Sequence, residues 1–373
     1  MVGYEKNFTT IAKVIWIVFF LLLENCHGQF NDGLFVRQLG IQDILRIEVD
    51  LFGKKVDAMI DSGAPLCIID SQFDLNLTGS TSKLAKRGEM VFWSDLTLNT
   101  LNRPIKYSPV ATTDLAPMSK IFAADIKAVL GAPFLANRIL GSKDGHFYVA
   151  DDDFAHKNHD AQAVQVDLYG MCHTKDVKLI DNNPRSFLID TGFNSAVCID
   201  TLEFTKLYEQ GHISGVRIGN RIGVIGPTQF RCGVLRHLVA WDVEFFDVPV
   251  YEGGHFSVGL ALLSKFNFSL NVQKKSLTIS RRRDVGADFL IDQSGLGLKS
   301  DSDRIMVGFV HAGSKASELG FLVGDQIETV GGEVVRRKDI NDLRSMLSDY
   351  QKWPVKMRVK RKGKSIEIIF KGK

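Results

Sequence analysis

The 373-residue sequence lacks several features that would place it quickly in a functional class. Its net charge is only +3, which is too small to argue for a nucleic-acid partner. It has no Cys-x-x-Cys pair and no histidine-rich stretch, so we expect no metal and no cofactor. It also has no Gly-x-Ser-x-Gly segment or similar nucleophile context, which argues against a serine hydrolase.

Long hydrophobic runs are scarce as well. Residues 14–23 form an uncharged apolar run of ten, which is too short to span a membrane and is typical of a signal-peptide core. Residues 26–28 read Cys-His-Gly, a small-x-small cleavage pattern, so residues 1–28 are interpreted as a signal peptide. The protein is then exported and periplasmic, associated with the cell envelope or secreted. A lipidated Cys26 or an uncleaved anchor remain as alternatives, and they are the only membrane attachments that we expect.

Cysteine is rare, and four cysteines would remain after cleavage. Cys67 and Cys198 lie in apolar, strand-like runs and are expected to be buried thiols. Cys172 and Cys232 have more polar surroundings, and an exported chain could join them in a disulfide. The sequence leaves this pairing open.

The sequence does contain a long internal repeat. Residues 56–70 read VDAMIDSGAPLCIID, and residues 185–200 read RSFLIDTGFNSAVCID. In both, an apolar strand leads into Asp, then Ser or Thr, then Gly, and returns to apolar residues. A second landmark, AVLGAPFL at 128–135, recurs as FSVGLALL at 256–263. Because the landmarks recur in the same order among strand-like runs, the sequence predicts a duplicated all-β unit.

Asp61 and Asp190 are the candidate catalytic residues. A single Asp-Ser-Gly or Asp-Thr-Gly is a common turn, but equivalent residues of a duplicated unit can meet at a pseudo-two-fold axis. Two carboxylates that lie close together cannot both ionise, so they share a proton. The ionised carboxylate can then take a proton from a water while the protonated one polarises a carbonyl. This is the chemistry of amide hydrolysis without a covalent intermediate.

On these motifs, residues 40–280 resemble the retropepsin-like aspartic peptidases in their two-lobed, single-chain form. The four matching motifs are Asp61-Ser62-Gly63-Ala64, Val129-Leu130-Gly131, Asp190-Thr191-Gly192 and Val258-Gly259. The resemblance implies a mainly β fold with two β-barrel lobes, residues 29–155 and 156–284. It also implies aspartic endopeptidase activity on polypeptide substrates.

The resemblance assigns further roles around the two aspartates. The hydroxyls of Ser62 and Thr191 would bond across the dyad, and each apolar-apolar-Gly segment would thread through a loop that bears an aspartate. The residues expected to support the dyad are Ser62, Gly63, Gly131, Thr191, Gly192 and Gly259. A glycine-rich hairpin would close over the substrate; the candidates are residues 215–226 and 86–95, and either could be an ordinary surface hairpin.

The sequence departs from the family pattern at three positions. Ser257 stands where an apolar residue is usual, Phe193 stands where a small residue is commoner, and Pro65 follows Ala64. Ser195 could supply the dyad with a donor that Phe193 lacks. These departures keep a second function class open, in which the chain is an inactive binding or scaffold protein with a peptidase fold.

The character of the sequence changes near Val285. Residues 285–373 are of domain size and are predicted to contain a helix near Asp339–Ser348 and a closing strand pair. The stretches SGLGLKSD at 294–301 and GDQIETVGG at 324–332 resemble a PDZ domain, with spacing seen in exported bacterial proteases. The resemblance implies a small α+β domain that recruits a substrate or partner.

In a PDZ domain, backbone N–H groups of a glycine-rich turn hold the terminal carboxylate of a peptide ligand. The residues that match this loop are Gly295, Leu296, Gly297 and Leu298. His311 is interpreted as a surface histidine of a strand in this domain rather than as a ligand or a base.

Overall fold

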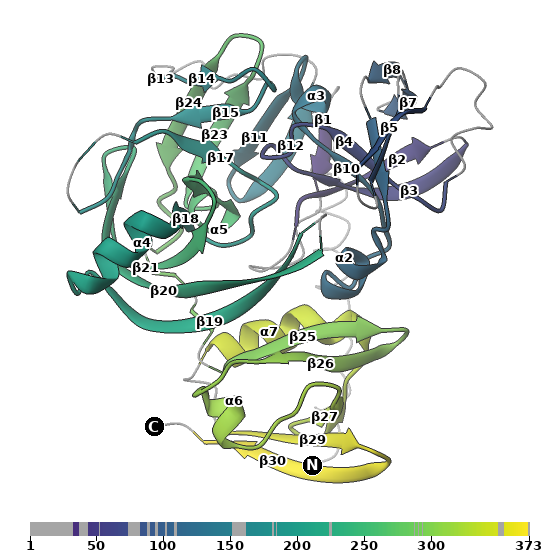
Figure 1. The fold of residues 1–373 in the computed structure, drawn as a ribbon, viewed down its shortest axis with the longest axis vertical. Coiled ribbons are helices and arrows are strands. Elements are labelled where there is room, and N and C mark those ends of the chain that lie inside the picture. The colour runs from purple at the N-terminus through teal and green to yellow at the C-terminus, as the bar shows by residue number, and fades with distance from the viewer. Residues whose placement is uncertain are drawn as a thin grey trace, which may run out of the picture.

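The structure is a computed structural model, and it is mainly β with four sheets (Figure 1). It describes residues 33–36, 44–51, 53–73, 83–87, 90–93, 96–100, 103–107, 110–150, 162–180, 183, 185–223, 226–286, 288–289, 291–292, 294–349 and 354–371. The predicted signal peptide, residues 1–28, lies outside these ranges. Within them, no helix is long and apolar enough to cross a membrane.

The first sheet is formed by the first repeat and has the strand order β5-β6-β9-β4-β10-β3-β2-β7-β8. Its strands are β2 (Arg46–Leu51), β3 (Lys54–Ile60), β4 (Cys67–Asp70), β5 (Lys83–Arg87), β6 (Met90–Trp93), β7 (Leu96–Thr100), β8 (Arg103–Tyr107), β9 (Val110–Thr113) and β10 (Ile126–Leu130). Every second residue of β2 is buried, which turns one face of this strand to the core. Helices α2 (Ala116–Ile121) and α3 (Ala132–Leu135) flank β10.

The second sheet is formed by the second repeat, in the order β14-β15-β17-β22-β18-β21-β20-β16, with β19 paired to β20. Its strands are β14 (Gln165–Val166), β15 (Cys172–Thr174), β16 (Val177–Lys178), β17 (Phe187–Ile189), β18 (Val197–Asp200), β19 (Ile213–Gly223), β20 (Gly226–Ala240), β21 (Val243–Gly253) and β22 (Ser257–Val258). Helix α4 (Thr201–Glu209) follows β18, and α5 (Leu260–Leu263) follows β22.

The two sheets repeat one topology. The order β3-β10-β4-β9-β6-β5 in the first corresponds to β17-β22-β18-β21-β20-β19 in the second. Corresponding neighbours are also parallel or antiparallel alike. The described strands do not close into the barrels expected from the resemblance, because the edge strands β5 and β8 of the first sheet do not pair with each other.

A third sheet joins the two repeats, in the order β1-β12-β11-β23-β24-β13. Its strands are β1 (Gly33–Val36), β11 (Ile139–Lys143), β12 (His146–Ala150), β13 (Gln162–Ala163), β23 (Phe266–Asn271) and β24 (Ser276–Arg281). The central pair, β11 with β23, has one strand from each repeat. One hydrophobic core accordingly contains side chains from both repeats.

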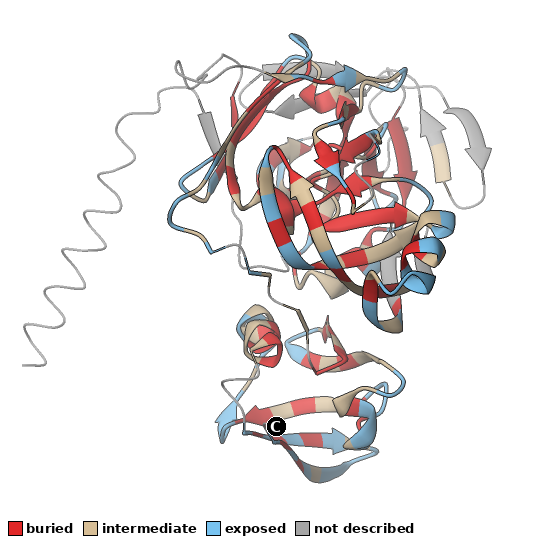
Figure 2. Ribbon diagram, turned by 90° about the vertical axis from the view of Figure 1, so that its left-hand side faces the viewer, coloured by how far each residue is buried: buried red, intermediate tan, exposed pale blue. Residues whose placement is uncertain are grey.

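The fourth sheet belongs to a C-terminal module, defined here as residues 294–371, in which β28 pairs with β27 and the main order is β25-β26-β27-β29-β30. Its elements are β25 (Leu296–Asp301), β26 (Arg304–Val310), α6 (Lys315–Glu318), β27 (Gln326–Val330), β28 (Glu333–Val334), the 3-10 helix η3 (Arg337–Asp339), α7 (Ile340–Ser348), β29 (Val355–Arg361) and β30 (Lys364–Phe370). The expected helix and strand pair are α7 and β29–β30. The module has a hydrophobic core of its own, and Figure 2 shows its buried positions apart from those of the repeats.

Candidate active site

The two aspartates occupy equivalent places in the two sheets. Asp61 follows the last residue of β3, and Asp190 follows the last residue of β17. The Asp61 N–H donates to Leu130 O at 3.0 Å, and the Asp190 N–H donates to Val258 O at 2.9 Å. Each aspartate is therefore fixed by the neighbouring strand that carries the second landmark of its repeat.

The side chains of Asp61 and Asp190 lie in hydrogen-bond contact with each other. A Cβ atom at Gly63 would lie 2.5 Å from Asp190 Cγ, and one at Gly192 would lie 2.3 Å from Asp61 Cγ. Real Cβ atoms do not come so close, so only glycine lets each loop pack against the carboxyl group of the other repeat. The duplicated Gly is thus a requirement of the pair.

Ser62 and Thr191 connect the two loops beneath the aspartates. The Ser62 N–H donates to Thr191 Oγ1 and the Thr191 N–H donates to Ser62 Oγ, both at 3.0 Å. The Ser62 hydroxyl donates to Ile189 O at 2.6 Å, and the Thr191 hydroxyl donates to Ile60 O at 3.1 Å. Both side chains are buried, so these four bonds satisfy groups that water does not reach.

Gly131 and Gly259 lie under the same loops. A Cβ atom at Gly131 would lie 2.2 Å from Leu66 O, and one at Gly259 would lie 2.3 Å from Phe193 O. These contacts with backbone oxygens leave no room for a side chain. The two apolar-apolar-Gly segments therefore pass directly against the loops that bear the aspartates, as the resemblance implies.

The surroundings of the pair disfavour two negative charges. Burial raises the pKa of Asp61 and holds the pKa of Asp190 well above its usual value, where the charge of Asp61 adds to the shift. Backbone donors act in the opposite direction: the Gly63 N–H reaches Asp61 Oδ1, and the Gly192 N–H reaches Asp190 Oδ1, both at 2.9 Å. Burial and like charge prevail, so the pair holds a proton where isolated carboxyls would have lost it.

Phe193 and Ser195, whose roles the sequence left open, both lie in contact with Tyr251 in the structure. The Phe193 N–H donates to Asp190 Oδ1 at 3.1 Å, while its ring packs edge-on against Tyr251 with centroids 5.6 Å apart. The Ser195 hydroxyl bonds to the Tyr251 phenol, whose pKa is raised by burial to about 12. A backbone N–H, rather than the Ser195 hydroxyl, thus donates to Asp190 from this loop.

Tyr251 was not identified from the sequence. It lies on β21, about 60 residues after Asp190, and no local pattern marks it. Ser257, the other departure, is 1% exposed, and its hydroxyl has no hydrogen-bond partner within the described part of the chain.

The two candidate flaps fall on equivalent hairpins. Residues 86–95 overlap β5 and β6, and residues 215–226 overlap β19 and β20. Residues 88–89, 94–95 and 224–225 lie outside the described ranges. The hairpin β19–β20 contacts both the first repeat and the C-terminal module, and those contacts are described below.

The glycine-rich loop of the module lies at the start of β25. The Leu296 N–H donates to Ser294 Oγ at 3.1 Å, and the Gly295 N–H donates to Asp292 Oδ2 at 3.0 Å. Two of the backbone donors near the predicted carboxylate site are therefore bonded within the chain. Gly297 and Leu298 belong to β25 itself and pair with β26.

His311 is interpreted from the sequence as a surface histidine of a strand in the module rather than as a ligand or a base. It follows β26, is partly buried, and its Nδ1 lies 2.7 Å from Ile218 O on β19. Burial lowers the pKa of His311. The structure adds a partner that the sequence does not reveal, because this partner is a backbone carbonyl from another part of the chain.

The four described cysteines are free thiols, and all are buried. The Cys172–Cys232 disulfide that the sequence left open is absent from this structure. Burial raises the pKa of Cys67 and of Cys172 to about 12, so neither thiol ionises readily. In the described ranges no three His, Cys, Asp or Glu side chains are grouped to hold a metal ion.

Neither a scan of protein-family models nor a search of curated proteins finds a match for this chain.

Proposed function

We propose that the protein is an aspartic endopeptidase of the retropepsin-like kind, with a two-lobed catalytic unit and a C-terminal PDZ-like module. The observation that carries the proposal is the Asp61–Asp190 contact, with both pKa values raised and the two loops bonded through Ser62 and Thr191. A turn with no catalytic role has no need of two carboxyl groups placed against each other at an energetic cost.

The geometry supports a mechanism without a covalent intermediate. The pair holds one proton, so one carboxylate accepts a proton from a bound water while the other carboxyl donates to the substrate carbonyl oxygen. The hydroxide adds to the carbonyl carbon and forms a neutral tetrahedral intermediate. Proton transfer to the amide nitrogen then lets the C–N bond break, and the products are a carboxylic acid and an amine. The Ser62 and Thr191 bonds would hold the two carboxyls in register during these transfers.

The equivalent strand orders of the two sheets support the two-lobed unit. The separate core of the C-terminal module supports a domain boundary near Val285. A role in export, with residues 1–28 as signal peptide, stays a prediction from the sequence.

The decisive experiment is cleavage of casein or of a peptide library by residues 29–373, with a pepstatin-type inhibitor and the Asp61→Asn variant alongside. Cleavage that the inhibitor blocks and the variant lacks supports the proposal. The competing class, an inactive binding or scaffold protein, predicts no cleavage by the wild-type protein under any pH, and this outcome would replace the peptidase proposal.

A further inference from the structure

The C-terminal module lies against both repeats, and its contact with the first repeat is made by α2. The last carbonyls of a helix lack partners within the helix, and here side chains of the module supply them. Ser300 Oγ donates to Lys120 O at 2.9 Å. Arg344 Nη2 donates to Ile121 O.

The same contact continues beyond the end of α2. Arg337 Nε donates to Ala123 O at 3.1 Å, and the Ala123 methyl packs against the hydrophobic core of the module. Ala123 has a φ of +51°, in the left-handed region where residues other than glycine are disfavoured. Ala123 is therefore held in a strained backbone conformation at the point where Arg337 of the module bonds to its carbonyl.

Two of the polar side chains of the module that make this contact are almost fully buried. β25 is an edge strand of its sheet, yet Ser300 on β25 is only 3% exposed. Arg344 on α7 is 9% exposed and donates to Leu298 O as well as to Ile121 O. The helix α2 packs against β25, so it covers the edge where an added peptide strand would otherwise bind.

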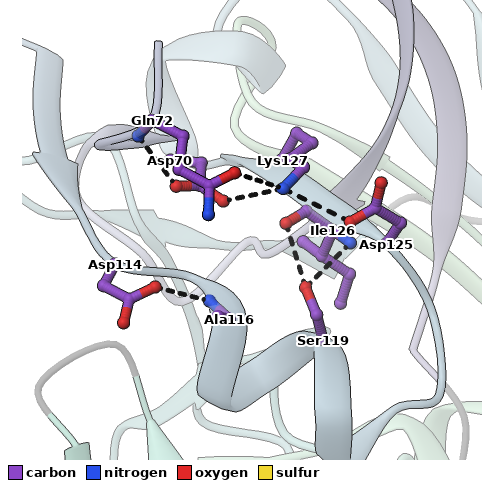
Figure 3. A network of polar contacts seen from close by, with 8 residues as sticks. All are labelled: Asp70, Gln72, Asp114, Ala116, Ser119, Asp125, Ile126 and Lys127. Atoms are coloured by element: carbon purple, nitrogen blue, oxygen red, sulfur yellow. Dashed lines mark hydrogen bonds and ion pairs between the residues drawn. The ribbon is translucent and has the colours of Figure 1, made fainter. Parts of the chain in front are cut away.

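Helix α2 is fixed to the strand that holds Asp61. Figure 3 shows Ser119 Oγ donating to Ile126 O and accepting from the Ile126 N–H, at 3.2 and 3.0 Å. In the same view, Lys127 pairs with the fully buried Asp70 at 3.2 Å. Both Ile126 and Lys127 lie on β10, whose last residue accepts the Asp61 N–H. The position of α2 is thus coupled, through β10, to the position of Asp61.

The second contact of the module is with the hairpin β19–β20 of the second repeat. His311 Nδ1 donates to Ile218 O at 2.7 Å. Just before the module, Asp292 O accepts from Arg217 Nη1 at 2.9 Å. Strand β19 also packs against α2 of the first repeat. The hairpin therefore reaches from one repeat to the other and is held there by the module.

From the hairpin, aromatic contacts lead to the aspartates. Phe230 on β20 stacks against Tyr251 with centroids 5.0 Å apart, and Tyr251 contacts Phe193. The Phe193 N–H in turn donates to Asp190. The hairpin β19–β20 is thus connected, through Tyr251 and Phe193, to the loop that bears Asp190.

We infer that the face formed by β25 and α7 is a docking surface for α2 of the same chain, and that this docking holds the hairpin β19–β20 closed across the two repeats. A substrate enters only when the hairpin lifts, so the docked module restrains hydrolysis. The closing role rests on the proposed peptidase function, whereas the docking itself does not.

The test uses the full chain and two variants that loosen the contacts separately. Ser300→Ala with Arg337→Met removes two bonds to the α2 end, and His311→Phe removes the bond to β19. Arg336→Met is the matched control, since Arg336 is the neighbour of Arg337, is exposed, and forms its ion pair with Asp303 of the module. Hydrogen exchange of residues 213–223 is measured together with the rate of peptide cleavage.

We expect both loosened variants to exchange the β19 amides at least tenfold faster and to cleave peptides several-fold faster, with the control unchanged. Unchanged exchange in β19 for both variants would overturn the docking role. Faster exchange with a lower cleavage rate would overturn the closing role. If the double variant also loses protection in β27 and β29, its module has unfolded, and His311→Phe alone decides in the same way.

The exchange measurement separates this inference from the proposed function. If no variant and no wild-type protein cleaves a peptide, the peptidase proposal fails while the exchange of β19 still tests the docking. If cleavage is normal but exchange is unaffected, the docking inference fails and the peptidase proposal stands.

Discussion

Ser62 and Thr191 lie 129 residues apart, and each donates its backbone N–H to the hydroxyl of the other at 3.0 Å. Each hydroxyl also donates to the backbone carbonyl of the strand before the opposite aspartate. The two loops are therefore one hydrogen-bonded unit, in which the loss of one hydroxyl leaves buried groups of both repeats without partners.

We expect Ser62→Ala and Thr191→Val each to lower the free energy of unfolding by about 1–3 kcal/mol, because each leaves a buried amide and a buried carbonyl unpaired. The double variant should lose less than the sum, since both changes break the same network. Ser257→Ala is the control: this serine is also buried, but its hydroxyl has no partner in the described chain. Urea denaturation measures all four, and a Ser257→Ala loss equal to that of Ser62→Ala would contradict the account.

Asp61→Asn and Asp190→Asn should each abolish hydrolysis while leaving the fold intact. Either variant keeps the shape of the pair but loses the carboxyl that accepts or donates the shared proton. Cleavage assays on purified variants, with circular dichroism to report folding, test this. Near-normal cleavage by either variant would remove the dyad from the mechanism.

The same two variants should gain stability at neutral pH relative to the wild-type protein. A carboxyl whose pKa is raised by folding contributes stability that is fully present below its unfolded value, near 3.8, and is lost as the pH rises through the folded value. An amide does not titrate, so it avoids this loss. Thermal melts from pH 3.5 to 8 should show the advantage of the variants growing as the pH rises. A constant difference across this range would mean that the pair is not strained by charge.

The pH optimum should be mildly acidic to near neutral, because Ala64 and Phe193 offer no side-chain donor to the pair. Phe193→Thr restores a hydroxyl at the position where acid-acting members of the resembling family commonly carry one. It should shift the acidic limb of kcat/KM downward by about one pH unit, which corresponds to about 1.4 kcal/mol. Phe193→Leu, which adds no donor, is the control. A wild-type optimum below about pH 4, with almost no activity at pH 6, would refute the prediction.

Residues 29–285 should fold without the C-terminal module and retain at least basal cleavage of short, unstructured peptides, since the truncation also removes the inferred restraint of the module on β19–β20. The core of the two repeats is largely separate from that of the module. Truncation therefore removes contacts at α2 and β19, and also the Phe289 ring that packs against the core of the repeats. Cooperative thermal unfolding and peptide cleavage by the truncated chain test this. An insoluble or wholly inactive product would show that the module belongs to the catalytic unit.

The parts of the site that could be predicted from the sequence are those marked by a short local motif that occurs in both repeats. Asp61 and Asp190 stand out because the same short pattern recurs around each, and only a duplication brings such distant residues to one axis. Tyr251 could not be found in this way, since it reaches the site through the pairing of β18 with β21. Cys232 was placed in polar surroundings by its neighbours in sequence, yet β20 turns its side chain inward.

The contacts between the module and the repeats were also beyond sequence reasoning. The acceptors at Lys120, Ile121, Ala123 and Ile218 are backbone carbonyls, which every residue has. Arginine and serine on the module look like ordinary polar residues until the partner surface is known. The duplicated pattern predicts neither which strands lie at an edge nor what covers them.

The pairing of β11 with β23 has a consequence for synthesis of the chain. The sheet that joins the repeats takes β11 from the first and β23 from the second, so β11 has one open edge until residues 266–271 have been made. About 120 residues separate these strands, which corresponds to on the order of 10 s at typical rates of translation. During that interval the nascent first repeat presents an unpaired strand edge, a template for association with other chains. We therefore expect the isolated first repeat to aggregate or to recruit chaperones, and the full chain to become soluble only after its second half has emerged.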